Sequence, residues 1–437
     1  MRYRIRSRLS DFLRHTLVQN ALSLYGVQIA GYVLPIITIP YLARVLGASG
    51  WGLLAFAQAF GSYWAVLGEY GFSLSATREV AYHRDNREKL TEILAGVLGA
   101  KGLLAAASLP FALLARLWIP AFRDHPGLLW AGMFWALAQG FNIMWFFSGF
   151  ERLRLVAGLD ISAKALTTIG IFVLVRAPED ASLVLVLQGT GFLLSFAVGL
   201  GLVYRELPVR LPTWNSCRGA LRMGWSMFLF RSSVSLYTAG NAFILGLFVS
   251  PQVVGYYAGA EKISRAFLGL LAPVCQTLYP RLSHLVHRER DRAARLARVG
   301  VALMAGGGTV IGVVVFFIAP LLVRIILGND FAEAAPVLRI LSLLMPLVGV
   351  NVALGIQWML PLGLERAFNM IIVLAGLVNI GMATALASDY KGLGMAWAVV
   401  CAEAFVAVSI YAVLRFRKLD PLSHQPKPHG EIVQVES

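Results

Sequence analysis

Residues 39–56, with the sequence IPYLARVLGASGWGLLAF, decide the fold of this chain. They close one long apolar run and open the next, and a glycine-rich turn lies between the two. The stretch 241–261, NAFILGLFVSPQVVGYYAGAE, repeats this arrangement, with Gly255 at the place of Gly52. Using one unit twice is a common way to build a protein around a central pathway, so the pattern predicts two related halves.

The composition around this stretch is that of a membrane protein. The chain has 437 residues, of which 58% are hydrophobic and 14% are charged. A soluble globular chain carries about 45–50% apolar and about 25% charged residues. The net charge of +15 comes from basic residues between the apolar runs, where cytoplasmic loops would lie. Positive-inside bias explains it more simply than nucleic-acid binding, and no nucleic-acid partner is expected.

A helix needs about 20 mostly apolar residues to cross a bilayer. Twelve runs satisfy this requirement: 17–40, 53–74, 91–115, 128–150, 155–175, 183–204, 225–248, 253–279, 299–323, 337–360, 369–388 and 392–414. Similar sequences, SGFERLR at 148–154 and LGLERAF at 362–368, follow the fourth and tenth runs. We therefore expect an all-α integral membrane protein with about 12 transmembrane helices in two parallel six-helix halves.

The distribution of Lys and Arg predicts the orientation. Of the 38 such residues, 26 lie in the two tails and the even-numbered loops, and 6 lie in the odd-numbered loops. This asymmetry places both termini in the cytoplasm. The predicted units are a basic cytoplasmic segment (1–16), a first half (17–204), a cytoplasmic linker (205–224), a second half (225–414) and a cytoplasmic tail (415–437).

The sequence lacks the motifs of catalysis. There is no G-x-x-x-x-G-K-[ST] loop, no HExxH and no GxSxG, and the three cysteines show no ligand spacing. No enzymatic activity, metal or cofactor is therefore expected. A membrane-embedded polysaccharide polymerase or glycosyltransferase is an alternative, but it needs a substantial external loop for its chemistry. The external loops here are short.

Charged residues inside the spans are the candidates for function. Each costs about 2.5–3.5 kcal/mol at a helix centre on insertion scales, so it faces a partner, the bundle interior or a hydrated cavity. The candidate substrate-binding cations are Lys101, Lys164, Arg231, Lys262 and Arg265. An Arg side chain can bind two phosphate oxygens at once, and a Lys side chain acts as a point charge. A cavity with these residues would therefore attract an anionic solute.

Simpler roles exist for several of these charges. Asp160 and Lys164 are spaced i,i+4 on one predicted helix, as are Glu261 and Arg265, so each pair can neutralise itself. Lys101, Arg231 and Lys262 have no such local mate. We expect these three to face the cavity, with interhelical salt bridges and snorkelling as the alternatives. Glu69 and Glu261 are the candidates for ion coupling, although Glu69 is also placed to anchor the end of its span.

At these residues the chain resembles the Wzx-type oligosaccharide flippases of the multidrug/oligosaccharidyl-lipid/polysaccharide exporter superfamily. The resemblance rests on the opening segment QNALSLYGVQIAGYVLPIITIPYLARVLGASGWGLLAFAQAF, the REVAYHRDNREK loop, WFFSGFERLR, and VVGYYAGAEKI. It extends over nearly the whole chain. These motifs are degenerate rather than catalytic, so they identify the family and not the substrate.

The resemblance implies a V-shaped pair of six-helix lobes around a central cavity that opens alternately to each leaflet. It implies that the cargo is an undecaprenyl-pyrophosphate-linked oligosaccharide, moved across the bacterial inner membrane for surface polysaccharide synthesis. By position in the spans, Lys101, Arg231, Lys262 and Arg265 would meet the anionic head group. Membrane lipids, a polysaccharide polymerase and chain-length proteins are the implied partners.

Two related transporters are the rival interpretations. An ion-coupled drug or cation antiporter of the same superfamily would be expected to use intramembrane carboxylates, whereas the unpaired charges here are mainly basic. A lipid II flippase usually carries additional spans. Twelve predicted spans therefore favour the oligosaccharide flippases.

Overall fold

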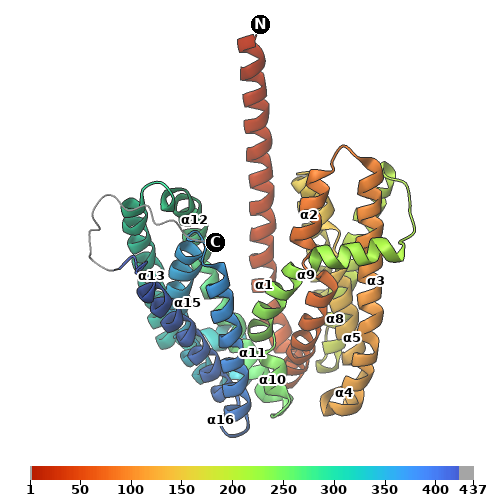
Figure 1. The fold of residues 1–437 in the computed structure, drawn as a ribbon. Coiled ribbons are helices and arrows are strands. Elements are labelled where there is room, and N and C mark those ends of the chain that lie inside the picture. The colour runs from red at the N-terminus through yellow and green to blue at the C-terminus, as the bar shows by residue number, and fades with distance from the viewer. Residues whose placement is uncertain (1, 423–437) are drawn as a thin grey trace.

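The structure, a computed structural model, describes the backbone of residues 2–422. Side chains are described from residue 34 onward, except for 35, 36, 153, 154, 156, 157, 230, 233, 234 and 236–238. Every regular element in residues 2–422 is a helix, which confirms the predicted all-α membrane fold (Figure 1). The predicted tail 415–437 lies outside the described residues beyond Leu422.

The first lobe contains the first six predicted spans. Its elements are α1 (Arg2–Glu69), α2 (Phe72–Tyr82), α3 (Arg87–Trp118), α4 (Pro120–Asp124), α5 (Pro126–Gly140), α6 (Met144–Gly149), α7 (Leu153–Leu174), η1 (Pro178–Asp180) and α8 (Ala181–Glu206). Two spans meet inside α1 at Gly47, whose φ of 63° suits glycine. The predicted span 128–150 is broken between α5 and α6.

The second lobe contains the other six predicted spans. Its elements are α9 (Trp214–Thr238), α10 (Asn241–Gly246), α11 (Pro251–Leu268), η2 (Gly269–Leu271), α12 (Ala272–Val286), α13 (Arg290–Ile326), η3 (Asn329–Phe331), α14 (Ala334–Leu341), α15 (Leu344–Asn351), the π-helix η4 (Val352–Met359) and α16 (Glu365–Phe416). Two spans meet inside α16 at Lys391.

Six helical stretches of the described chain are long and apolar enough to cross a membrane. The predicted spans 128–150, 155–175, 225–248 and 253–279 are not among them, and most of the span 17–40 lies before the first stretch, which begins at Ile37. The spans 128–150 and 225–248 are interrupted after α5 and after α9, and the span 253–279 passes through the 3₁₀-helix η2. Helix α7 covers the span 155–175 without a break. Interrupted spans are tolerated in membrane proteins where they are buried in protein or line a cavity.

The two lobes form a V. They spread apart toward the end that holds both labelled termini and converge at the opposite end, the apex, near α10 and α11 (Figure 1). The two glycines singled out in the sequence, Gly52 and Gly255, meet at this apex. A Cβ atom added to Gly52 would overlap the carbonyl oxygen of Pro251, and one added to Gly255 would overlap that of Ala48. Glycine therefore allows the two backbones to touch.

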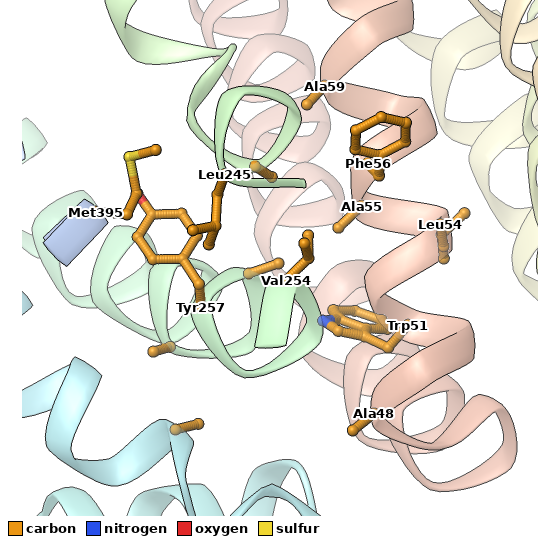
Figure 2. Close-up of a cluster of buried hydrophobic side chains, with 14 of the residues drawn as sticks. Ala48, Trp51, Leu54, Ala55, Phe56, Ala59, Leu245, Val254, Tyr257 and Met395 are labelled. Atoms are coloured by element: carbon orange, nitrogen blue, oxygen red, sulfur yellow. The ribbon is translucent and has the colours of Figure 1, made fainter. Parts of the chain in front are cut away.

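Apolar side chains surround this backbone contact. Trp51 and Phe56 of α1 pack with Leu245, Val254 and Tyr257 of the second lobe, and all five are buried (Figure 2). In a membrane, close van der Waals packing of such side chains, rather than their removal from water, holds helices together. The apex is thus a continuous apolar joint between the lobes.

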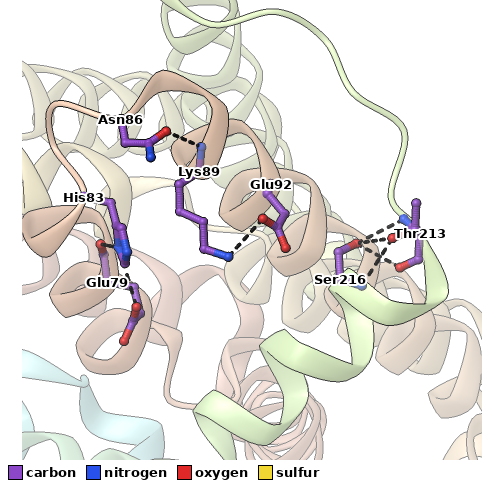
Figure 3. A network of polar contacts seen from close by, with 7 residues as sticks. All are labelled: Glu79, His83, Asn86, Lys89, Glu92, Thr213 and Ser216. Carbon is purple, nitrogen blue, oxygen red and sulfur yellow. Dashed lines mark hydrogen bonds and ion pairs between the residues drawn. The ribbon is translucent and has the colours of Figure 1, made fainter.

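Helix caps order the terminal side of the first lobe. The Asn86 side chain accepts a hydrogen bond from the Lys89 backbone N–H at 3.0 Å and starts α3, and Lys89 pairs with Glu92 at 2.9 Å (Figure 3). Thr213 and Ser216 form a reciprocal cap that starts α9. The predicted linker 205–224 therefore includes the start of α9, which packs against α3 before the helix continues toward α16.

Candidate functional site

A cavity of about 1200 Å³ lies between the lobes. Helices α1, α5, α7 and α8 line it from the first lobe, and α9, α10 and α11 line it from the second. Its lining extends from Ala55 and Ala258 near the apex to Glu69 and Ser73 on the terminal side. This is the central cavity that two lobes were expected to enclose.

The structure brings most of the predicted site residues together in this cavity. The lining residues among them are Lys164, Arg231, Lys262, Arg265, Glu69 and Glu261. They come from helices that are far apart in the sequence. Asp160 also lines the cavity.

Two of the cations are neutralised within their own helix. Lys164 Nζ donates to Asp160 Oδ2 at 2.6 Å, and Arg265 Nη2 donates to Glu261 Oε1 at 2.8 Å. Both pairs have the i,i+4 spacing that the sequence shows. Neutralisation within one helix, the simpler role considered for these residues, is therefore present in the structure.

Arg231 has a partner that the sequence did not indicate. Its Nε lies 3.5 Å from Glu69 Oε2, and its Nη1 donates to Ser73 Oγ at 3.3 Å. Glu69 also accepts hydrogen bonds from the backbone N–H groups of Gly71 (3.0 Å) and Ser73 (2.7 Å). It thus caps the start of α2 and ties α9 to the first lobe, which supports the anchoring role considered for it.

Lys262 differs from the other cavity cations. It forms no ion pair with any carboxylate that the structure describes, and its ammonium lies 5.7 Å from the ring centroid of Trp51, within the range of a cation–π contact. The described lining contains four cations and three carboxylates, so its formal charge is +1. Lys262 carries the charge that is not compensated.

Lys101 does not line this cavity, so the prediction that it does is wrong. The side chain is buried, with 1% of its surface exposed, and its Nζ donates to the carbonyl oxygens of Gly140 (2.5 Å) and Asn142 (3.2 Å). These carbonyls belong to the break between α5 and α6, where the last turn of a helix leaves acceptors without intrahelical partners. Lys101 therefore satisfies a helix end behind the cavity wall.

Replacing Lys101 with Ala should reduce stability and leave transport intact. The Gly140 and Asn142 carbonyls would lose their donor and a buried cavity would remain, so we expect the unfolding temperature in detergent to fall by at least about 2 °C. Transport per folded molecule should stay within about twofold of wild type, because a lost hydrogen bond at this helix end touches no lining residue. A variant that unfolds normally but no longer transports would contradict this structural role.

Three glutamines in the cavity lining were not anticipated. Gln58 on α1, Gln139 on α5 and Gln188 on α8 line the first-lobe side, and we call them the amide wall. Gln58 Nε2 donates to Gln188 Oε1 at 3.0 Å, which links α1 to α8. The available signal was an uncharged amide within each of three apolar spans, alone in two of them and followed by Asn142 in the third. A search restricted to charges passes over it.

Comparisons with known proteins agree with this architecture. The sequence model of the family described as "Polysaccharide biosynthesis protein" matches residues 17–286. The protein named "Putative O-antigen transporter" from Escherichia coli (strain K12) is 29% identical over 92% of this chain and 98% of its own length.

Solved structures of transporters share the fold. The lipid II flippase MurJ in its inward closed conformation superposes with a TM-score of 0.66 at 13% identity, covering 92% of this chain and 90% of that chain. An inward-facing multidrug resistance transporter of the MATE family, in the MOP superfamily, gives a TM-score of 0.62 at 14% identity, covering 92% and 99%. At such identities these similarities describe the fold alone.

Proposed function

Because the chain belongs to the polysaccharide biosynthesis protein family, we propose that it is a flippase for a lipid-linked oligosaccharide in the bacterial inner membrane. The proposed cargo is an undecaprenyl-pyrophosphate-linked unit, moved to the periplasmic leaflet for surface polysaccharide synthesis. The observation that carries this proposal is the cavity between the lobes, in which Lys262 presents a positive charge without a carboxylate partner. An anionic head group is the natural counter-charge.

The proposed cycle begins in the state that the structure has. With both termini in the cytoplasm, as the Lys and Arg distribution predicts, the V is open to the cytoplasm and ready to load. The head group binds Lys262 first. Arg231 and Arg265 then turn from their carboxylates to the phosphates, since a guanidinium binds phosphate oxygens in pairs. Rocking about the apex exposes the cargo to the periplasm.

Ion coupling has a place in the same scheme. When Arg231 and Arg265 turn to the phosphates, Glu69 and Glu261 lose their ion-pair partners. A carboxylate that loses a nearby cation becomes a better site for a proton or a sodium ion. Glu69 and Glu261 are thus the proposed coupling residues. A polysaccharide polymerase and chain-length proteins are the proposed partners that receive the cargo.

The test is a deletion strain examined on both sides of the inner membrane. We expect lipid-linked oligosaccharide to accumulate in the cytoplasmic leaflet, and surface polysaccharide to fall to background, because no other step brings the head group across. Leaflet location is measured by the access of an added glycosidase to the lipid-linked sugar in spheroplasts and in inverted vesicles. A plasmid copy of the intact chain is the control and should restore both readouts.

Other outcomes of this experiment point to the rival functions. Oligosaccharide that still reaches the periplasmic leaflet, together with a changed sensitivity to cationic drugs, would replace the proposal with the antiporter. Single units that reach the periplasmic leaflet but are not joined into polymer would indicate a polymerase.

A further inference from the structure

The two walls of the cavity differ in chemistry. The second-lobe wall carries Arg231, Glu261, Lys262 and Arg265. The first-lobe wall is rich in neutral hydrogen-bonding side chains, among them the three glutamines of the amide wall with Thr168 and Ser195. Its own charges are Glu69, at the terminal end, and the Asp160–Lys164 pair, whose members neutralise each other. Charge and neutral polarity are therefore separated across the cavity.

The amide wall has hydrogen-bonding capacity available to a ligand. The bond from Gln58 to Gln188 fixes both side chains and uses one donor and one acceptor, so that Gln58 Oε1 and Gln188 Nε2 can still bind a ligand. The side chain of Gln139 makes no hydrogen bond with any group that the structure describes. An amide both donates and accepts, as a sugar hydroxyl does, so the two match without any charge.

An aromatic ring stands beside these amides. Trp135 lines the same wall, and its indole packs on α1 at Gly61, where an added Cβ would lie 3.1 Å from the ring carbon Cε3. The absence of a side chain at Gly61 gives the ring its place. An indole presents a flat apolar surface, which suits the C–H faces of a pyranose ring whose hydroxyls are bound by neighbouring amides.

We propose that Gln58, Gln139, Gln188 and Trp135 form a subsite for the uncharged sugar rings of the cargo. This inference rests on the proposed function. The head group lies against Lys262 on the second lobe while the first sugars lie against the first lobe, so the cargo bridges both walls of one cavity. The second lobe recognises the carrier lipid, which many glycans share, and the first lobe selects the glycan.

The test compares two ligands on the purified full-length chain. The first is undecaprenyl pyrophosphate without sugar, and the second is the lipid-linked oligosaccharide extracted from the deletion strain. Wild type should bind the glycosylated lipid at least about tenfold more tightly, as several hydrogen bonds to sugar hydroxyls allow. Gln139→Leu, or the pair Gln58→Leu with Gln188→Leu, should reduce that preference by about threefold or more. Lys262→Gln should weaken the binding of both ligands by a similar factor.

A matched glutamine serves as the control. Gln252 lies on α11 outside the cavity lining and donates to the Tyr256 hydroxyl at 2.7 Å, so Gln252→Leu should leave the preference unchanged. A preference that survives both amide variants, or a wild type that binds the two lipids equally, would overturn the sugar subsite alone. Failure of the wild type to bind either lipid would overturn the proposed function, and this inference with it.

Discussion

Replacing Lys262 with Gln should lower surface polysaccharide at least about tenfold while the protein stays in the membrane at its normal level. Lys262 supplies the one uncompensated positive charge of the described cavity lining, so its loss leaves a neutral lining. A hydrogen bond to a charged group is worth about 1.5–3 kcal/mol, or about 10- to 150-fold in affinity. Immunoblotting of membranes gives the protein level, and gel analysis of cell envelopes gives the polysaccharide.

Two variants separate the charge of Lys262 from its shape. Lys262→Arg keeps the charge and should retain at least about half of the transport, since both cations bind phosphate. The paired change Asp160→Asn with Lys164→Gln removes a cation and a carboxylate together, so the lining keeps its formal charge of +1. It should transport far better than Lys262→Gln. Equal losses in the two would show that uncompensated charge is not what binds the cargo.

Placing a methyl group at the apex should stop transport by disturbing the contact between the lobes, without changing the charge of the cavity. In Gly52→Ala or Gly255→Ala the new Cβ would overlap a carbonyl oxygen of the other lobe, which is backbone and cannot rotate away. Such overpacking costs about 1–3 kcal/mol, and here it also separates the lobes at the joint about which they rock. We expect at least about a tenfold loss of surface polysaccharide and a lower unfolding temperature in detergent.

Gly102 on α3 offers the matched control. No atom lies within 4 Å of a Cβ added there, so Gly102→Ala should leave transport and stability unchanged or slightly improved. If Gly52→Ala and Gly255→Ala support normal polysaccharide, the close contact between the two backbones is not required for the cycle.

Much of the fold was predictable from the sequence because hydropathy and internal repetition report on whole spans. The turn at Gly47 and the repeat that pairs Gly52 with Gly255 are local signals, and both correspond to features of the structure. The breaks inside spans were not predictable in the same way. The interruption at 141–143 is as apolar as the helices around it, so hydropathy does not distinguish it from an unbroken span.

The candidate site was predictable where its contacts are local. The Lys164–Asp160 and Arg265–Glu261 pairs follow from helical spacing alone. The partner of Arg231 lies at the far end of α1, and no pattern in one sequence connects them. Lys101 was misplaced for a related reason. A lone charge on an apolar helix gives no signal of the direction in which it points. The Lys101 side chain points toward the broken end of α5 rather than into the cavity.

The single uncompensated charge of the cavity has an electrical consequence under the proposed function. The empty cavity is positive, and a pyrophosphate head group outweighs that charge, so the loaded cavity is negative while Glu69 and Glu261 have taken up no coupling cation. A membrane potential acts on each elementary charge with about 2.3 kcal/mol per 100 mV. An inside-negative voltage therefore drives the loaded cavity outward and returns the empty one inward. Export should accelerate in proteoliposomes when a potassium diffusion potential of that sign is imposed, and slow when the sign is reversed.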